Sequence, residues 1–425
     1  MSAPAPTLLI VTRHYAPEPT GSAPPMQEMA EWFAANGFAT EVVTVRPNYP
    51  GERIFPGYEQ GQHDQAVEAG VQVRRFPTAP VRGGGLLARM GPELAFMFRL
   101  VAARIAGRLS ARPALISLSP SIFTVFGALP LKAGGGRHVA VVHDIQSGLG
   151  SALGGGLTRA LMPILRALER WTLNRPDAII VLSEEMKRHL RAMGVRRPIE
   201  IQPPMVNAQF IRPAQEPGGV PTLMYSGNLG RKQGLGQVLD LAAELKRRGS
   251  PARIIVRGGG AMRDELIAEA AERRLDNLDI QDLVPRDQIG RSLAEAHLHL
   301  VPQIASGGDF AVPSKIFSIM AAGRTFVATA QPGSTLAQLA AETGAFVCAP
   351  PDDAAAFADA VETLLADPAQ RQRAATAGRA YVEAHADTSV VMAKLSTLLR
   401  RPEAAADRSS SLASTRTDDL RHTRS

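Results

Sequence analysis

Short apolar runs alternate with amphipathic stretches through most of this chain, and the pattern restarts near its middle. Apolar runs that are bounded by Gly, Pro, Asn or Asp predict buried strands, and the stretches between them predict helices. Strands and helices that alternate in this way form parallel sheets. The predicted strands are residues 7–12, 40–45, 71–75, 114–118, 139–142 and 178–182, then 222–226, 253–257, 278–281, 298–301, 325–329 and 345–348.

The restart predicts two domains, and 425 residues also exceed what a single hydrophobic core usually serves. A proline-rich segment separates the halves, so we expect a hinge near residues 204–220. The predicted fold class is α/β, with two Rossmann-like parallel-sheet domains, 1–205 and 206–400, facing a cleft. We expect the last helix to pack back on the first domain. The tail 401–425 lacks apolar periodicity, which is typical of disorder.

The formal net charge of +7 is compatible with an anionic partner such as nucleic acid, membrane or ligand. Only six of the basic residues are lysines, against 41 arginines, and aromatic residues make up 5% of the chain. Because bases stack on aromatic side chains, this composition argues against a nucleic-acid partner. A single cysteine, Cys348, excludes an internal disulfide and a multi-cysteine zinc site. No leader or membrane-spanning apolar run is evident, so we expect a cytoplasmic protein.

The run 222–226 is followed by a glycine-rich turn that carries Arg231 and Lys232 and leads into a predicted helix. Backbone N–H groups, a helix start and two cations at one place can bind a diphosphate without a metal ion. Basic residues beside a turn are also commonly just solvated, and the sequence leaves that alternative open.

A second glycine-rich loop leads into Pro313, Ser314 and Lys315 at the start of another predicted helix. Ser314 can accept a hydrogen bond from a free helix N–H, and Lys315 can reach an anion at the same end. Two such helix starts suggest one ligand with two phosphates, and a capped buried helix is the alternative. The turn at residues 256–266, which includes Gly258, allows close approach of a ligand or simply a tight turn.

In the first half, the loop after strand 7–12 carries Gly21 but lacks the Gly-x-Gly-x-x-Gly fingerprint of dinucleotide sites. This loop should lie at the carboxyl edge of its sheet, where ligands bind. His143 and Asp144 follow strand 139–142 and suit acid–base chemistry or acceptor binding, and a structural His–Asp pair is equally compatible. Asp-x-Asp, His-Glu-x-x-His, Walker and Gly-x-Ser-x-Gly motifs are absent from the sequence, which disfavours metal-bridged transfer and the corresponding hydrolases.

In this order, the motifs resemble the retaining, metal-independent glycosyltransferases of family 4, which have the GT-B fold, and are most similar to the branch that builds colanic-acid-type exopolysaccharides. The similarity spans residues 7 to about 395. It is carried by Tyr15-Ala-Pro-Glu-Pro-Thr-Gly21, Pro47-Asn-Tyr-Pro50, His143-Asp144-Ile145, Ser183, Ser226-Gly-Asn-Leu-Gly230, Pro313-Ser-Lys315 and Met320-Ala-Ala-Gly323.

The resemblance implies a donor site at the carboxyl edge of the second sheet, extended by the first-domain glycine loop. The implied donor-site residues are Gly21, Asn228, Arg231, Lys232, Gly258, Ser314, Lys315 and Ser318. The family's Glu-x7-Glu pair, which contacts the transferred sugar and the ribose, is missing here: Ser318 holds the second place, and Phe310, with Asp309 beside it, holds the first. Asp309 is therefore the candidate sugar contact, and His143 and Asp144 are the candidate catalytic residues.

The implied reaction moves a sugar from a nucleoside-diphosphate sugar to a lipid-linked or oligosaccharide acceptor, with the nucleotide sugar as co-substrate and neither cofactor nor metal. Two other classes remain open: a sugar-nucleotide epimerase-like enzyme, and a catalytically silent nucleotide-sugar-binding subunit, which the missing glutamates permit. Residues 86–112 read as an arginine-rich amphipathic helix that can lie on the inner membrane. A core-facing helix is the alternative there, and residues 157–175 are a second candidate for membrane contact.

Overall fold

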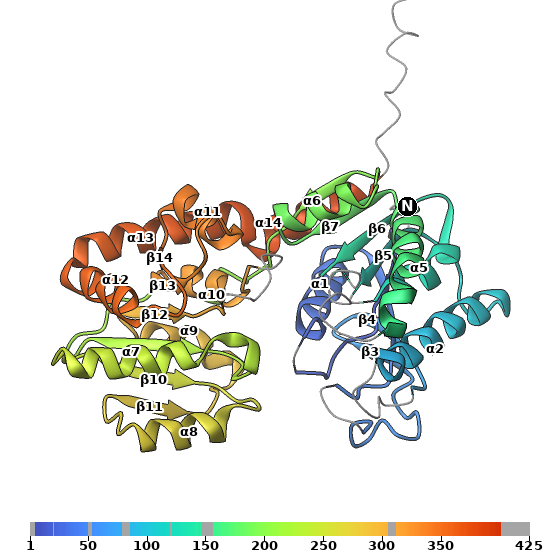
Figure 1. The fold of residues 1–425 in the computed structure, drawn as a ribbon. Helices are drawn as coiled ribbons and strands as arrows, with labels where there is room; N and C mark the ends of the chain where they lie inside the picture. Colours follow the sequence, from blue (N-terminus) through green and yellow to red (C-terminus); the bar gives the residue numbers. More distant parts are fainter. Residues whose placement is uncertain are drawn as a thin grey trace, which may run out of the picture. The chain divides into compact units, whose positions relative to one another are not determined.

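The protein forms two sheets (Figure 1) and divides into two compact units, and the division between the units runs through the first sheet. The computed structural model describes residues 5–19, 21–49, 53–78, 86–119, 121–143, 145, 156–304 and 312–400. One unit runs to Ala140 and includes Pro176–Ala178 and the chain from Leu395. The other comprises Val141–Arg175 and Ile179–Lys394.

The first sheet has the strand order β3-β4-β2-β1-β5-β6-β7-β8. Its strands are β1 (Thr7–Val11), β2 (Ala39–Val45), β3 (Gln65–Glu68), β4 (Val71–Phe76), β5 (Arg112–Ser119), β6 (Lys132–Val142), β7 (Ala178–Val181) and β8 (Ile199–Ile201). The helices between them are α1 (Ala23–Ala35), α2 (Leu86–Ile105), α3 (Ile122–Ala128), α5 (Gly156–Leu173) and α6 (Glu184–Ala192). β1 pairs in parallel with β2 and β5, and β3 is antiparallel to β4.

The second sheet has the order β11-β10-β9-β12-β13-β14, and its neighbouring strands all pair in parallel. Its strands are β9 (Thr222–Ser226), β10 (Arg253–Arg257), β11 (Leu278–Gln281), β12 (Leu298–Val301), β13 (Phe326–Thr329) and β14 (Val347–Ala349). Its helices are α7 (Gly236–Arg247), α8 (Arg263–Glu272), α9 (Ile289–Ala294), α10 (Lys315–Ala321), α11 (Thr335–Thr343), α12 (Ala354–Ala366), α13 (Pro368–Tyr381) and α14 (Thr388–Leu399).

The strand order of the second sheet indicates at which edge a ligand is expected to bind. The chain builds outward from β9 to β10 and β11, then crosses back to β12 on the other side. In such doubly wound sheets, ligands bind at the carboxyl ends of the strands where the order reverses. The loops that follow β9 and β12 therefore form the expected site, and β1 between β2 and β5 is the corresponding point of the first sheet.

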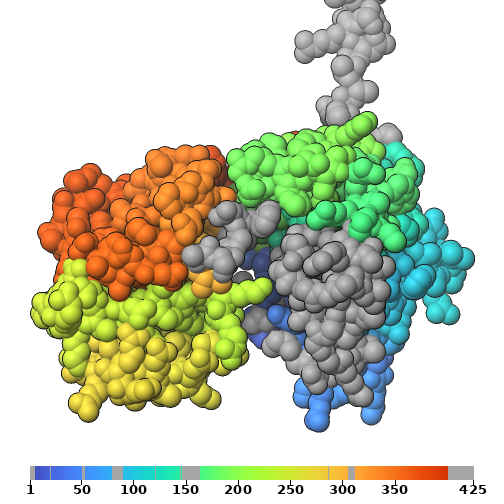
Figure 2. Space-filling model, in the orientation of Figure 1, coloured from blue at the N-terminus to red at the C-terminus, as the bar shows by residue number. Residues whose placement is uncertain are grey.

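Helices cover both faces of the second sheet because its strands are apolar on both sides. Leu223 and Tyr225 of β9 belong to one buried cluster with residues of α7 and α12, and Ile316 and Phe317 of α10 belong to another with residues of β13. α12 packs against both α7 and α13, and these helices form a continuous outer surface in Figure 2.

The predicted strands are confirmed, most of them to within two residues. The two missed strands, β3 and β8, are short, and their side chains are partly exposed, so they lack a buried apolar run. β6 starts at Lys132, earlier than predicted. Its first part contains three glycines and no apolar run, so the sequence pattern did not reveal it. A Cβ on Gly136 would lie 2.6 Å from the Pro113 carbonyl oxygen, so glycine lets β6 approach β5 there.

The proline-rich segment is bonded to the second unit over much of its length, which corrects the expected hinge at 204–220. Val206 N–H donates to the Ala386 carbonyl, and Asp387 Oδ1 accepts the Ala208 N–H at 3.0 Å. Three arginines then hold the backbone or side chains of residues 208–216: Arg379, Arg324 and Arg371. These bonds hold residues 206–216 within the second unit.

Among the described helices, none has the length and apolar character needed to cross a bilayer. α2, the 20-residue helix Leu86–Ile105, carries charged residues along its length. The predicted disordered tail 401–425 lies outside the described residues.

Candidate active site

Two glycine loops lie against each other at the carboxyl edge of the second sheet. After β9, the Gly227 N–H donates to the Arg257 carbonyl and the Leu229 N–H donates to the Gly259 carbonyl. A Cβ on Gly258 would lie 2.1 Å from the Gly227 oxygen, so this residue must be glycine for the loops to meet. Gly258 thus has a packing role, which its sequence motif alone did not reveal.

Lys315, the first residue of α10, reaches this pair of loops. Its Nζ lies 3.7 Å from the centroid of the Tyr225 ring and 3.2 Å from the position a Cβ on Gly227 would take. No described carboxylate forms an ion pair with it. Burial lowers the pKa of the Lys315 ammonium from 10.5 to about 7, because a charge removed from water without a counterion is costly. An anion bound here would supply the missing counter-charge.

Arg231 and Lys232 lie further along the same loop, in a short 3-10 helix (Arg231–Gln233) before α7. Both are exposed, and the Arg231 guanidinium lies 3.8 Å from a Glu265 carboxylate oxygen with 76% of its side chain exposed. An exposed pair at that distance is weak, so the guanidinium can turn to a ligand at little cost. Gly234, with φ of +65°, ends the short helix and lets α7 begin.

Asn228, Ser314 and Ser318 complete the described part of the predicted donor site. Asn228 is exposed, and its side-chain oxygen lies 2.7 Å from the position of a Cβ on Gly260. Ser314 precedes α10 but forms no capping hydrogen bond, which corrects the expected role of its side chain. Ser318 is partly buried one turn after Lys315. Asp309 lies outside the described residues.

The carboxyl edge of the first sheet carries a polar cluster around the loop after β1. Glu18 Oε1 accepts the N–H groups of Asn48 and Tyr49, each at 2.9 Å, and Glu18 Oε2 lies 2.8 Å from His14 Nδ1. The Tyr49 ring approaches to 3.5 Å of the position of a Cβ on Gly21, which is exposed with φ of +70°. The positive φ favours glycine at position 21, whereas the distance to the Tyr49 ring is an ordinary van der Waals contact.

His143 directly follows β6 and is partly buried. Desolvation lowers the pKa of its imidazole to about 4, so the ring is neutral at pH 7. A neutral ring can donate or accept a hydrogen bond to a hydroxyl but offers no positive charge to a phosphate. Its predicted partner, Asp144, lies outside the described residues.

Both halves of the chain match known sequence families. Residues 20–204 match the family described as Glycosyl transferase 4-like domain, and residues 207–381 match the family described as Glycosyl transferases group 1. The chain is a family 4 glycosyltransferase. The predicted enzyme class is confirmed.

A curated relative of this glycosyltransferase is the putative colanic acid biosynthesis glycosyl transferase WcaI of Escherichia coli K12, which is 28% identical over 91% of this chain and 97% of its own length. Two solved structures share the GT-B fold: sucrose-phosphate synthase of Thermosynechococcus elongatus, with a TM-score of 0.70 and 17% identity, and Anabaena HepE in complex with UDP and glucose, with 0.64 and 13%. They cover 92% and 93% of this chain, and the chain covers 98% and 99% of theirs.

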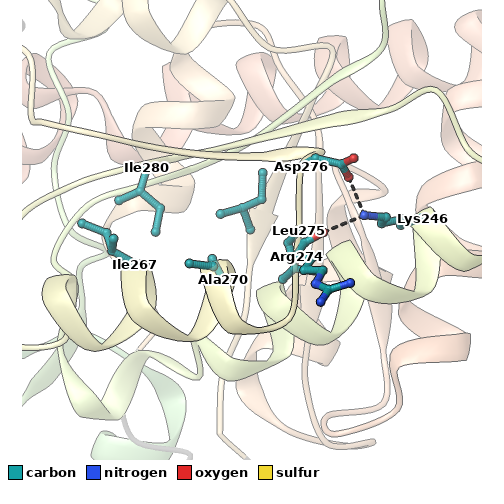
Figure 3. Close-up of a pocket in the computed structure, with 9 residues that line it drawn as sticks. Lys246, Ile267, Ala270, Arg274, Leu275, Asp276 and Ile280 are labelled. Atoms are coloured by element: carbon teal, nitrogen blue, oxygen red, sulfur yellow. Dashed lines mark hydrogen bonds and ion pairs between the residues drawn. The ribbon is translucent and has the colours of Figure 1, made fainter.

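A cavity of about 630 Å³ in the glycosyltransferase lies away from these edges (Figure 3). Lys246, from the last turn of α7, bonds Asp276 Oδ1 at 2.8 Å there, and Ile267 and Leu275 form apolar walls. Helices of a parallel sheet run opposite to its strands, so the ends of α7 and α8 mark the amino edge of β10 and β11. The cavity is therefore on the edge opposite the expected ligand site.

Several buried polar residues of the first sheet and its loops and helices were not singled out from the sequence. Arg13 Nη1 bonds Glu93 Oε1 at 2.9 Å, and both residues are buried. His138 is also buried, contacts Ser117 Oγ at 2.7 Å, and has its pKa lowered to about 3 by desolvation. Glu18 and Asn48 stood within the motifs that carry the resemblance, but only the fold brings those two motifs together.

Proposed function

We propose that this glycosyltransferase moves a sugar from a nucleoside-diphosphate sugar to a hydroxyl of a glycan or lipid-linked acceptor during synthesis of an exopolysaccharide or another cell-envelope polymer. The configuration at the anomeric carbon is retained, and no metal ion takes part. The WcaI relative, described as a colanic acid biosynthesis enzyme, supports the pathway class. The HepE structure with UDP and glucose supports a nucleotide-sugar donor.

The observation that carries this proposal is the ammonium of Lys315, which is partly buried, lies at the point where the strand order reverses and has no carboxylate partner among the described residues. When the bond between the anomeric carbon and the phosphate oxygen breaks, negative charge develops on the leaving diphosphate. A fixed cation in a partly desolvated site stabilises that charge strongly. Loss of one such group typically costs about 3 kcal/mol, or roughly a hundredfold in turnover.

The other predicted residues have graded roles in this proposal. Arg231 and Lys232 are exposed on the adjacent loop, so they add charge to the approach of the diphosphate and contribute less per residue than Lys315. His143 is neutral, so it hydrogen-bonds to a hydroxyl of the sugar or of the acceptor. The loop around Gly21 lies at the corresponding edge of the first sheet, and its role in this proposal is the one that the resemblance implies, beside the diphosphate and the acceptor.

The testing experiment measures thermal stabilisation by UDP, GDP and ADP, with and without EDTA, for the wild type and two lysine variants. We expect at least one nucleoside diphosphate to raise the melting temperature, EDTA to leave that shift unchanged, and Lys315→Met to abolish it. Lys246→Met is the matched control, because Lys246 lies at the opposite edge of the same sheet. Indifference to all three nucleotides, or full stabilisation of Lys315→Met, would contradict the proposal.

A binding subunit without transfer is the second candidate, because Ser318 lies where the resemblance implies a glutamate. Without that carboxylate the ribose of the nucleotide loses one expected contact. The two candidates differ in one readout: the enzyme releases the nucleoside diphosphate from the stabilising nucleotide sugar over time, whereas the silent subunit binds it and leaves it intact.

We also propose peripheral contact with an anionic membrane, and the described side chains favour α5 over the predicted 86–112 segment. In that segment Arg99 and Arg104 donate to the Pro77 and Pro130 carbonyls, and Arg112 pairs with Glu41. These three arginines are engaged within the fold, and membrane contact through residues 86–112 stays a prediction. Phe98 and Ile105 of α2 remain exposed.

α5 combines exposed apolar and basic side chains. Ile164 and Trp171 are seven residues apart and share one helix face, with 65% and 45% of their surface exposed. Arg166 and Arg170 are exposed on the same helix, and the Arg175 guanidinium lies 4.2 Å from the Trp171 ring centroid. An aromatic and aliphatic stripe flanked by arginines suits the interface of an anionic bilayer.

A further inference from the structure

Tyr225 lies directly against the ammonium group of Lys315. It is a fully buried residue of β9, and the centroid of its ring is 3.7 Å from Lys315 Nζ. Its hydroxyl donates to the Asn228 carbonyl at 2.7 Å, which ties the ring to the loop that follows the strand. Both the core packing and this hydrogen bond fix the orientation of the ring.

Gly227 also lies against the ammonium. A Cβ at this position would lie 3.2 Å from Lys315 Nζ and 3.4 Å from Cε, so glycine leaves the room that the lysine side chain occupies. Its φ of +141° is also a conformation that other residues rarely adopt. The Tyr225 ring and the Gly227 backbone together form what we term the Lys315 seat.

We propose that Tyr225 is a positioning residue whose ring holds the Lys315 ammonium at the carboxyl end of β9 so that it meets the diphosphate of the donor. This inference rests on the proposed function, in which Lys315 binds that diphosphate. Tyr225 does not touch the ligand in this arrangement. It acts only through Lys315.

A ring holds a lysine in a way that a carboxylate does not. A lysine side chain has four rotatable carbon–carbon bonds and otherwise samples many positions. The face of an aromatic ring attracts the ammonium but leaves its charge unneutralised. A carboxylate would pair with it, and a diphosphate would then have to displace that partner.

Arg257, at the end of the neighbouring strand β10, illustrates the contrast. Its guanidinium is buried and bonds Glu295 at 2.8 Å, as well as the side chains of Gln281 and Ser292. These partners use up its donors, so Arg257 serves the fold. Lys315 is held by a ring and has no carboxylate partner among the described residues, so its amine stays available to a ligand, and burial lowers the pKa of its ammonium.

The test is a double-mutant cycle that measures binding by calorimetry, with UDP as the probe and uridine as its phosphate-free control. GDP with guanosine, or ADP with adenosine, replaces this pair if the wild type prefers that base. We expect Tyr225→Leu to weaken UDP binding about tenfold, as a lost cation–π contact in a desolvated site predicts. Tyr225→Phe keeps the ring and should stay within about threefold of the wild type. Uridine binding should change in neither variant.

The Lys315→Met background separates positioning from general structural damage. If Tyr225 acts through Lys315, then Tyr225→Leu has no further effect on UDP affinity once Lys315 is replaced. If Tyr225→Leu weakens UDP equally in both backgrounds, or weakens uridine as much as UDP, the inference is overturned. A Tyr225→Leu variant that binds UDP as tightly as Tyr225→Phe overturns it as well.

A measurement on the unaltered protein covers the case in which Tyr225→Leu does not fold. The chain has six lysines, so selective 13C labelling of lysine gives a small set of ε-methylene signals. We expect one signal shifted upfield by the Tyr225 ring current and absent from Lys315→Met; a spectrum without such a signal overturns the inference. A protein that shows the shifted signal but binds none of the three diphosphates contradicts the proposed function, and the ligand role of the seat falls with it.

Discussion

The carboxylate of Glu18 accepts the backbone N–H of Asn48 at 2.9 Å, and this bond joins the loop after β1 to the loop after β2. The same carboxylate oxygen accepts the Tyr49 N–H, and the other lies 2.8 Å from His14 Nδ1. Glu18 itself is 3% exposed. One buried side chain therefore sets the shape of the first sheet's ligand edge, including the position of Tyr49 beside Gly21.

Replacing Glu18 with alanine should destabilise the protein by about 3 kcal/mol, because the buried Asn48 N–H and the partly buried Tyr49 N–H lose their acceptor. Glu18→Gln keeps one acceptor oxygen and should cost less. Urea unfolding measures the free energy of unfolding of both variants. Glu272→Ala, at an exposed position on α8, is the control and should stay within about 0.5 kcal/mol of the wild type. Equal effects at the two positions would show that Glu18 does not hold these loops.

The stability of the ligand-free protein should depend on pH through Lys315. The pKa of this lysine is about 7 in the folded chain and near 10.5 in the unfolded chain. Between these values only the unfolded chain holds the proton, so the free energy of unfolding rises with pH. We expect the wild type to gain about 2 kcal/mol relative to Lys315→Met from pH 7 to pH 9 and nothing below pH 6.

Urea unfolding at pH 6, 7, 8 and 9 measures that difference, and a constant gap between the two proteins would contradict it. Binding of a nucleoside diphosphate should reverse the effect by restoring the proton. At pH 8 the calorimetric heat of UDP binding should then depend on the ionisation enthalpy of the buffer, whereas Lys315→Met should lack this component.

Arg379 of α13 should be a major determinant of stability in the second unit. It donates to the carbonyls of Ala208, Ile211 and Ala321, and its side chain is 16% exposed. Arg379→Met leaves these acceptors without a donor and should cost about 3 kcal/mol. Arg373→Met on the same helix, where the side chain is 70% exposed, should be nearly neutral. Chemical unfolding measures the free energy of unfolding of both variants, and similar losses of stability would refute the role assigned to Arg379.

Membrane contact through α5 predicts cosedimentation with phosphatidylglycerol vesicles at low salt and loss of binding at high salt. Replacing both Ile164 and Trp171 with serine should abolish it. Phe98→Ser on α2 is the matched control and should bind as the wild type does. Loss of binding in the α2 variant alone would assign the contact to α2, and absence of binding by the wild type would remove the membrane proposal.

The sequence by itself determined most of the strands and the edge of each sheet at which the glycine loops lie. Runs such as 222–226 and 253–257 are apolar at consecutive positions because both faces of a parallel sheet are buried, and that pattern is local. Strands without it, such as β3 and β8, were missed. The order of the glycine, proline and lysine motifs also sufficed to indicate the family, since each motif is a short contiguous segment.

Only the tertiary structure decided what each polar side chain bonds. Lys315 meets Tyr225, and Glu18 meets Asn48, because separate segments converge at one sheet edge. Likewise, Arg99 and Arg379 resemble solvated arginines in sequence, yet they donate to carbonyls of distant loops. Hydrogen bonds and desolvation depend on distances of a few ångströms between residues far apart in the chain, and the periodicity of a sequence carries no record of those distances.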